Sequence, residues 1–172
     1  MRGRARLIAA LALASLAPVV SATPAQILLV RHAEKAEAPK GDPGLSPQGQ
    51  QRAQALDAAL RETRIDAVLT TPFQRTRETA APLRVRRLLL EIVVPVEGDH
   101  ISAMLTRLQD LPDHGTALVV GHSNTLAPII RGLGGPELSD LRECEFDRLY
   151  VLDTTPPVRL IQARYGASNP SC

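Results

Sequence analysis

The chain is poor in aromatic residues, with two phenylalanines, two tyrosines and no tryptophan among its 172 residues. A site that stacks a nucleotide base or a sugar ring on aromatic side chains therefore has few candidates. This scarcity favours small or polar ligands.

Cysteine is equally scarce, since Cys144 and Cys172 are the only two. Neither a CxxC nor a CxxH spacing occurs, so the sequence predicts no zinc site. An oxidising compartment would permit a disulfide between the two cysteines. A pair so near the end of the chain is not the framework of a disulfide-rich fold, and the sequence leaves open whether they pair.

The charges are nearly balanced. Of the 20 basic residues, three stand in the first six positions, and the chain has 18 acidic residues. Without those three arginines, the remainder has one more acidic than basic residue. This composition lacks the positive excess by which proteins bind nucleic acid, so no nucleic-acid partner is expected.

The start of the chain has the pattern of a secretory signal peptide. Three arginines precede an apolar stretch at 7–16, and Val20, Ser21 and Ala22 supply the small residues that signal peptidase recognises. The apolar stretch, interrupted at Pro18, is shorter than the ~20 residues needed to span a bilayer. We therefore expect cleavage after Ala22, export to a bacterial periplasm or the exterior, and no stable membrane association afterwards.

Without the signal peptide at 1–22, residues 23–172 are long enough for a single domain. Apolar runs typical of strands alternate along it with helical patterns. The expected strands cover residues 27–30, 66–71, 91–96, 116–121, 147–153 and 158–165. The expected helices cover residues 45–63, 73–83, 101–111 and 124–133. This alternation predicts an α/β fold, a three-layer αβα sandwich with a mostly parallel sheet.

Local signals refine the helices. Ser46 is expected to cap the first helix and Pro47 to occupy its first position, whereas Pro82 is expected to break the second helix. Three residues of the third helix are expected to face the core: Ile101, Leu105 and Leu108. The stretch Arg84–Leu90, in which three arginines precede an apolar run, fits none of these signals.

Three of the expected strands end in residues that could hold a phosphate. Arg31 and His32 follow the first strand, Arg75 the second and His122 the fourth. Ligands of such sheets bind beyond the carboxyl ends of the strands. Arginine binds phosphoryl oxygens with paired donors, and imidazole can attack phosphorus or donate to its oxygens. The four side chains together predict an oxyanion site.

Four segments resemble, in this order, the successive motifs of the histidine phosphatase superfamily, also called phosphoglycerate-mutase-like. They are LLVRHAEK, LSPQGQQRAQAL, TTPFQRTRETA and LVVGHSNT. The resemblance extends from Ile27 to about Asp153, so it implies the phosphoglycerate-mutase-like fold for nearly the whole expected domain. The chain resembles a compact exported bacterial member of this superfamily.

The resemblance implies a phosphomonoesterase that needs no metal or other cofactor. His32 would attack the phosphoryl group and form a phosphohistidine that water hydrolyses, while Arg31, Arg75 and His122 would stabilise the charge on its oxygens. As a nucleophile, His32 must be neutral, with its other nitrogen donating, most simply to a backbone carbonyl. His122 would serve best protonated, and because two arginines disfavour that charge, the bound phosphate would have to compensate.

The proton donor to the leaving group is usually a Glu or Asp after the third strand in this superfamily. Asp99 is the candidate here and Glu97 its rival, although neither lies in a pattern that aligns with the family's. Asp99 could equally cap the helix that follows, and His100 beside it could equally donate. Glu34 and Lys35, just beyond the nucleophile, are expected to shape the rim of the pocket.

Other functions are compatible with the same pocket. A phosphate- or anion-binding protein would keep the pocket and lack turnover. A protein-phosphohistidine phosphatase is an alternative because compact members of that kind resemble this chain, although those act on cytosolic signalling proteins. A mutase fits poorly, since the short connection between Arg75 and His122 leaves little room for a lid. The expected partner is a small-molecule phosphate ester, and the sequence indicates neither which ester nor the oligomeric state.

Overall fold

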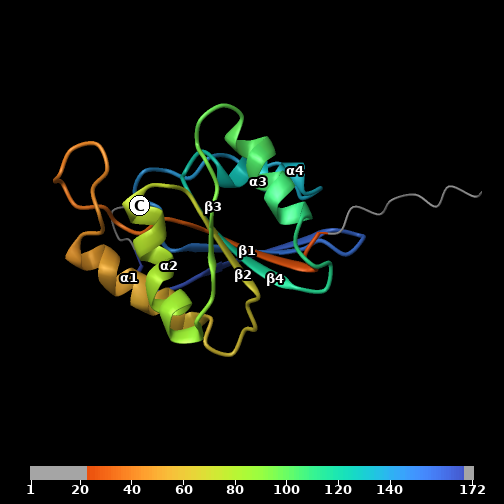
Figure 1. The fold of residues 1–172 in the computed structure, drawn as a ribbon, viewed down its shortest axis with the longest axis horizontal. Helices are drawn as coiled ribbons and strands as arrows, with labels where there is room; N and C mark the ends of the chain where they lie inside the picture. The colour runs from red at the N-terminus through yellow and green to blue at the C-terminus, as the bar shows by residue number, and fades with distance from the viewer. Residues whose placement is uncertain (1–22, 169–172) are drawn as a thin grey trace, which may run out of the picture.

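A six-stranded sheet forms the centre of the computed structural model, which describes residues 23–168 (Figure 1). The strands are β1 (Gln26–Arg31), β2 (Ala67–Thr70), β3 (Glu91–Val93), β4 (Thr116–Gly121), β5 (Arg148–Asp153) and β6 (Arg159–Arg164). The helices are α1 (Pro47–Ala59), α2 (Gln74–Arg87), α3 (His100–Gln109) and α4 (Leu126–Gly132). No helix within the described residues is long and apolar enough to cross a membrane. The expected signal peptide lies outside these residues, and so does Cys172, the possible partner of Cys144.

The strand order is β3-β2-β4-β1-β5-β6. The first four strands in this order pair in parallel, whereas β5 is antiparallel to β1 and β6 to β5. Helices α1 and α2 lie on one face of the sheet, and α3 and α4 on the other (Figure 1). The prediction of a three-layer α/β fold with a mostly parallel sheet is therefore confirmed.

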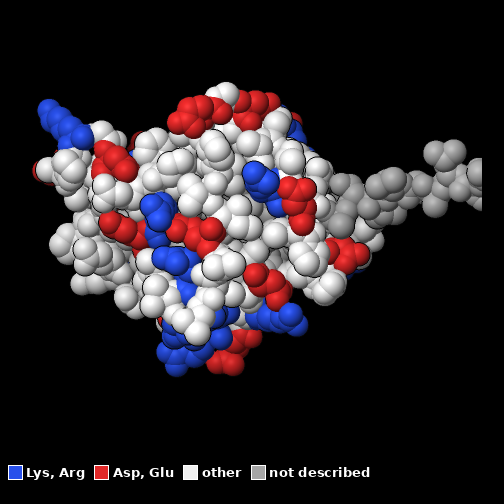
Figure 2. Space-filling view, in the orientation of Figure 1, with Lys and Arg blue, Asp and Glu red and all other residues white. Residues whose placement is uncertain are grey.

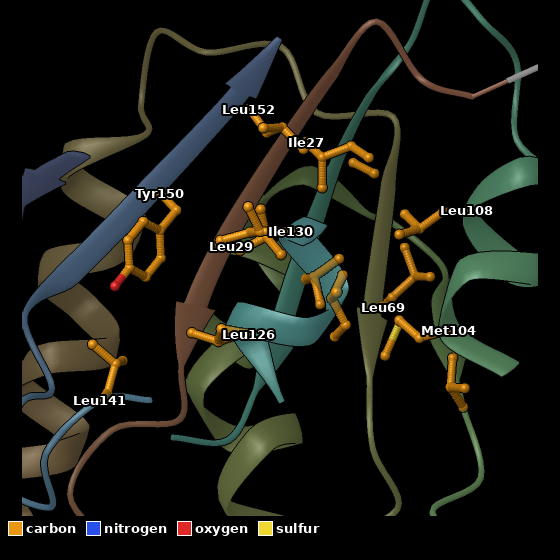
Figure 3. Close-up of a cluster of buried hydrophobic side chains, with 14 residues drawn as sticks. Ile27, Leu29, Leu69, Met104, Leu108, Leu126, Ile130, Leu141, Tyr150 and Leu152 are labelled. Atoms are coloured by element: carbon orange, nitrogen blue, oxygen red, sulfur yellow. The ribbon is translucent and has the colours of Figure 1, made fainter. Parts of the chain in front are cut away.

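Side chains of the central strands alternate between two cores. Leu28 and Val30 of β1 join a cluster with α1 and α2, while Ile27 and Leu29 join a second cluster with α3 and α4 (Figure 3). All four are at most 2 % exposed. A strand buried on both faces must be apolar at every position, which is why β1 appears in the sequence as an unbroken apolar run.

The first turn of α1 fixes the chain that follows β1. As predicted, Ser46 is the N-cap and accepts a hydrogen bond from the backbone of Gly49 at 3.1 Å. The helix passes so close to the loop that a Cβ at Gly49 would lie 2.1 Å from the carbonyl oxygen of Glu34. Glycine at this position therefore lets α1 pack directly behind the end of β1.

Pro82 does not break α2, contrary to the prediction. The helix continues to Arg87 because its neighbours Thr79, Ala80 and Leu83 are buried on its inner face. This packing outweighs the hydrogen bond that proline cannot donate to the carbonyl of Glu78.

The Arg84–Leu90 stretch is the end of α2. Its arginines occupy the last helical turn, where positive charge is favourable, and basic side chains gather at this end of the molecule (Figure 2). Arg86 pairs with Asp57 of α1 at 2.5 Å, and Arg87 donates to backbone carbonyls beyond α1. Leu88 follows the helix in the left-handed conformation, at φ 54°. A residue in this conformation ends many helices, and it is usually glycine.

Helix α3 begins at His100, and the three residues expected to face the core, Ile101, Leu105 and Leu108, all pack in or against the core cluster. His100, Met104 and Leu108 are buried, whereas Ile101 and Leu105 are partly exposed. These three buried positions are four residues apart and so share one face of the helix. This register directs the side chain of His100 into the molecule.

Candidate active site

The carboxyl ends of β1 and β4 meet at one edge of the sheet. Arg31 pairs in register with Gly121, and the backbone N–H of His32 donates to the carbonyl of Gly121 at 2.9 Å. His122 follows directly, so that the ring centroids of His32 and His122 are 5.3 Å apart. The structure thus brings together two histidines that are 90 positions apart in the sequence.

The turn between β4 and α4 orients His122. A Cβ at Gly121 would lie 2.9 Å from the hydroxyl oxygen of Thr125, and that same oxygen accepts the backbone N–H of His122 at 2.9 Å. The ring of His122 is held from the other side by Thr71, whose hydroxyl lies 3.2 Å from Nε2. Nδ1 is the ring nitrogen that remains for a ligand.

A cavity of about 580 Å³ opens at this edge. It is lined by the four predicted residues and by side chains from three further loops. The lining side chains used below are Arg31, His32, Lys35, Phe73, Arg75, His100, His122, Glu143 and Phe146. The roles of the four predicted residues remain predictions, but all four line one cavity.

His32 has the geometry of a nucleophile. It is 6 % exposed, and its Nδ1–H donates to the carbonyl oxygen of Ala33 at 2.8 Å, which leaves the lone pair on Nε2. Burial, followed by the charges of Arg31, Arg75 and Lys35, lowers the pKa of His32 to about 4, against the opposing effect of the Ala33 carbonyl. The ring is therefore neutral at neutral pH, as attack on phosphorus requires.

The ring of His122 is also neutral while no anion is bound. Burial lowers its pKa to about 3, and His32, Arg75, His100 and Arg31 act in the same direction. A bound phosphate dianion would reverse much of this electrostatic effect, because an adjacent negative charge favours the protonated ring.

Arg75 is an incompletely neutralised cation. Its guanidinium lies over the ring of Phe73 at 4.1 Å, and its closest carboxylate oxygen, on Asp42, is 3.7 Å away. Burial lowers the pKa of Arg75, Asp42 opposes this shift and Arg31 adds to it. Its hydrogen-bond donors are largely left for a ligand.

Arg31 is more fully bound by the protein. Nη1 donates to the carbonyls of Arg142 and Glu143 at 2.9 Å each, and Nη2 donates to the carboxylate of Glu143 at 2.8 Å. The guanidinium also lies 4.1 Å from the ring centre of Phe146. Its Nε is buried and has no hydrogen-bond partner in the described part of the chain, so this N–H is the donor available to an anion.

Phe73, Phe146 and Glu143 were missed by the sequence analysis. The composition holds a clue, since the two phenylalanines are the chain's only ones and both flank the cavity. No local pattern identifies Glu143, which reaches Arg31 across 112 positions. Lys35 lines the cavity as expected. Glu34 does not; it binds the buried Arg52 instead.

The two acidic candidates for the proton donor are not among the residues that line the cavity. Asp99 is the N-cap of α3, and its carboxylate accepts from Ser102 N at 3.1 Å and Ser102 Oγ at 2.6 Å. These hydrogen bonds lower the pKa of Asp99, so it is ionised and carries no proton to donate. Glu97 is exposed. The capping interpretation of Asp99 therefore fits the geometry, and His100 is the neighbour that reaches the cavity.

Within residues 23–168, no group of three or more His, Cys, Asp or Glu side chains is arranged to hold a metal ion.

Comparison with known proteins finds a family match over part of the chain and a shared fold. Residues 27–95 match the model of the histidine phosphatase superfamily (branch 1). No curated protein matches the chain in sequence.

Several solved structures share the fold. The protein histidine phosphatase SixA complexed with tungstate is 19 % identical, with a TM-score of 0.65 over 81 % of this chain and 96 % of SixA. The α-ribazole phosphatase from Shigella flexneri is 17 % identical, with a TM-score of 0.62 over 84 % of this chain and 100 % of its own. A mycobacterial glucosyl-3-phosphoglycerate phosphatase with VO3 is 15 % identical, with a TM-score of 0.60 over 83 % and 99 %.

Proposed function

We propose that this protein, of which residues 27–95 match the model of the histidine phosphatase superfamily, is a metal-independent phosphomonoesterase acting through a phosphohistidine on His32. The observation that carries the proposal is the hydrogen bond from His32 Nδ1 to the carbonyl of Ala33. It fixes the neutral tautomer whose lone pair is on Nε2, inside a cavity lined by two arginines.

The proposed reaction has two steps. Nε2 of His32 attacks the phosphorus in line as the ester P–O bond breaks, and water then attacks the phosphohistidine to release phosphate. Arg75, His122 and the free Nε–H of Arg31 bind the non-bridging oxygens and stabilise the charge that develops on them. These donors supply the electrostatic stabilisation that a metal ion supplies in other phosphatases.

The structural neighbours support a phosphatase that recognises tetrahedral oxyanions. Three of them are described as phosphatases, and two of these were solved with tungstate or VO3. A small, polar phosphate ester is the substrate class that fits best, because both phenylalanines of the cavity already contact arginines. The neighbour described as a protein histidine phosphatase supports a phosphohistidine side chain as the second candidate substrate.

Trapping of the intermediate tests the proposal. The P–N bond of a phosphohistidine is labile in acid, so the reaction cannot be stopped with acid. Wild-type protein is therefore mixed with a ³²P-labelled aryl phosphate and denatured in alkaline detergent. We expect a base-stable, acid-labile label on wild type and none on His32→Ala. The exposed His114 provides a matched control, since His114→Gln should label like wild type. Label retained by His32→Ala would identify a different nucleophile.

The anion-binding alternative makes a different prediction. A protein that only binds phosphate would show phosphate binding by calorimetry but no release of phenol from an aryl phosphate. Hydrolysis of a phosphoramidate and of an alkyl phosphate, compared at equal enzyme concentration, separates the two candidate substrates.

The N-terminal sequence is the observation that supports export. We propose that the mature protein starts at Thr23 and is found outside the cytoplasm. Intact-mass measurement of the exported protein should give the mass of residues 23–172, and a retained leader would contradict cleavage after Ala22.

A further inference from the structure

We propose that His100 is the acid–base catalyst of this site: its Nε2 gives a proton to the leaving oxygen in the first step and takes one from water in the second. This inference rests on the proposed phosphatase function. It assigns to an imidazole the task for which the sequence offered Asp99 and Glu97 as acidic candidates.

The ring of His100 is fixed with one nitrogen free. The side chain is 9 % exposed, and its Nδ1–H donates to the carbonyl oxygen of Pro95 at 2.7 Å. Nε2 is buried and has no hydrogen-bond partner in the described part of the chain. A buried polar atom without a partner is costly unless a ligand or water completes it, and this residue lines the catalytic cavity.

The fold explains why the ring points there. Asp99 caps α3 through Ser102 and thereby fixes the register in which His100, Met104 and Leu108 form the buried face. His100 also contributes to lowering the pKa of His122, so the two rings lie close enough to interact electrostatically.

The other titratable groups that line the cavity are committed elsewhere. His32 is the proposed nucleophile, and Nε2 of His122 contacts Thr71. Glu143 is bound to Arg31 and Ser123, and Arg31 lowers its pKa, so it carries no proton. Lys35 is exposed at the rim, and Arg31 and Arg75 do not release protons. Nδ1 of His122 is assigned to the non-bridging oxygens of the phosphate, so His100 is the remaining side chain of the cavity with an unpartnered nitrogen and no other assigned task.

The proton balance closes over the two steps. In the first, Nε2 of His32 forms a bond to phosphorus, the P–O ester bond breaks, and the proton on Nε2 of His100 passes to the alkoxide to give the alcohol. In the first turnover, this proton comes from the phosphate monoanion or from solvent. In every later turnover, it comes from the water of the preceding second step. In the second, Nε2 of neutral His100 takes a proton from water, whose oxygen bonds to phosphorus as the P–N bond to His32 breaks. Phosphate leaves, and His100 is protonated for the next cycle.

Two substitutions test this role with different geometry. In His100→Asn, the amide can still donate to Pro95 but leaves nothing at the position of Nε2. In His100→Gln, an amide reaches the position of Nε2 but cannot transfer a proton. Thermal unfolding by circular dichroism establishes that each variant is folded, and His114→Gln is the control for loss of a histidine.

The expected signature is a dependence on the leaving group. With an alkyl phosphate, both variants should lose roughly 10²–10⁴-fold in kcat, the usual contribution of general acid–base catalysis, without accumulating phosphoenzyme. With a p-nitrophenyl ester the first step needs little protonation. A burst of nitrophenol equal to the enzyme concentration should therefore appear, followed by slow turnover and labelled His32.

These outcomes separate the inference from its premise. If wild type itself gives no label and no turnover, the proposed function fails before His100 is reached. If wild type labels on His32 but both His100 variants slow alkyl and aryl esters equally, with no burst, then His100 is not the acid–base catalyst. The same conclusion follows if Asp99→Asn, rather than the His100 variants, gives the leaving-group signature.

Discussion

Two arginines, the buried Arg52 and the half-buried Arg75, differ in how completely the protein neutralises their charge. Arg52 of α1 is 3 % exposed, and its Nε and Nη2 donate to the carboxylate of Glu34 at 2.7–2.9 Å. Its Nη1 donates to the carbonyls of Tyr165 and Ala167. Arg75 has one carboxylate oxygen at 3.7 Å and an aromatic ring. The first arginine is satisfied by the protein, whereas the second retains donors for a ligand.

The pKa values of the two arginines shift in opposite directions. Burial acts to lower both, but at Arg52 the hydrogen bonds and charge of Glu34 outweigh it and raise the pKa. At Arg75 burial prevails and the pKa falls. Burial, and to a lesser extent the positive charge of the arginines, also lowers the pKa values of His32 and His122. Charge that the protein leaves without a close partner is therefore found at the edge proposed to be the active site.

The largest effect is expected for His32→Ala, which removes the atom that forms the covalent bond. Turnover of every phosphate ester should fall to background, because the other histidines of the cavity are positioned for different tasks. Initial rates with an aryl phosphate measure this. The variant should still bind inorganic phosphate by calorimetry, and residual turnover above background would show that His32 is not the nucleophile.

Breaking the pair of Arg52 and Glu34 should lower the free energy of unfolding. Arg52→Met leaves Glu34 buried and unpaired, and breaking such a pair typically costs about 3–5 kcal/mol. Urea unfolding measures this loss. The double variant Arg52→Met, Glu34→Leu should recover most of the stability, since it removes both charges. Equal losses in the single and double variants would mean that the pair itself, and not an orphaned charge, is what matters.

Arg75→Ala should have the opposite effect, because activity should fall while stability is retained. The value of kcat/KM should fall roughly 10²–10³-fold, the usual effect of losing one electrostatic donor. The free energy of unfolding should stay constant or rise slightly, because the substitution relieves repulsion with Arg31. Steady-state kinetics and urea unfolding on one preparation measure both quantities. A destabilised variant with normal kcat/KM would assign Arg75 the structural role of Arg52.

A smaller effect is expected from pH. The folded-state pKa values of about 4 for His32 and about 3 for His122 lie below the ordinary value of about 6.5. As the pH falls below 6.5, the unfolded chain takes up protons that the folded chain refuses, so stability declines until the pH reaches these folded values. Each histidine contributes at most about 1.4 kcal/mol per pH unit.

Unfolding titrations between pH 7 and 4.5 can isolate this effect. His122→Asn should lose less stability than wild type over this range, because one of the two linked protonations is gone. Carboxylates titrate in both proteins and so cancel in the comparison. Parallel curves would indicate that His122 is not desolvated in the folded protein.

A chelator should have no effect. Activity is expected to persist in excess EDTA, because the two arginines of the cavity, and His122 once a phosphate is bound, supply the positive charge. Rates before and after dialysis against EDTA test this. A loss restored only by a divalent cation would show that these side chains are insufficient on their own.

The sequence alone predicted the alternation of strands and helices and the four residues at the strand ends. Those features depend on short-range patterns. A fully buried strand must be apolar throughout, as in residues 27–30, and parallel strands bring their carboxyl ends to one edge wherever they pair. Arg31, His32, Arg75 and His122 could therefore be assigned to one edge before any contact was known.

Tertiary structure alone decided what surrounds that edge. Burial of its inner face carries α2 through Pro82, and Glu34 faces Arg52 and not the cavity. His100 turns inward because the fully buried face of α3 runs through Met104 and Leu108, with Ile101 packed beside it. Each of these outcomes depends on packing between segments distant in the sequence. A shift of one position turns a helix by about 100°, and packing against the completed core determines which side chains along the helix are fully buried.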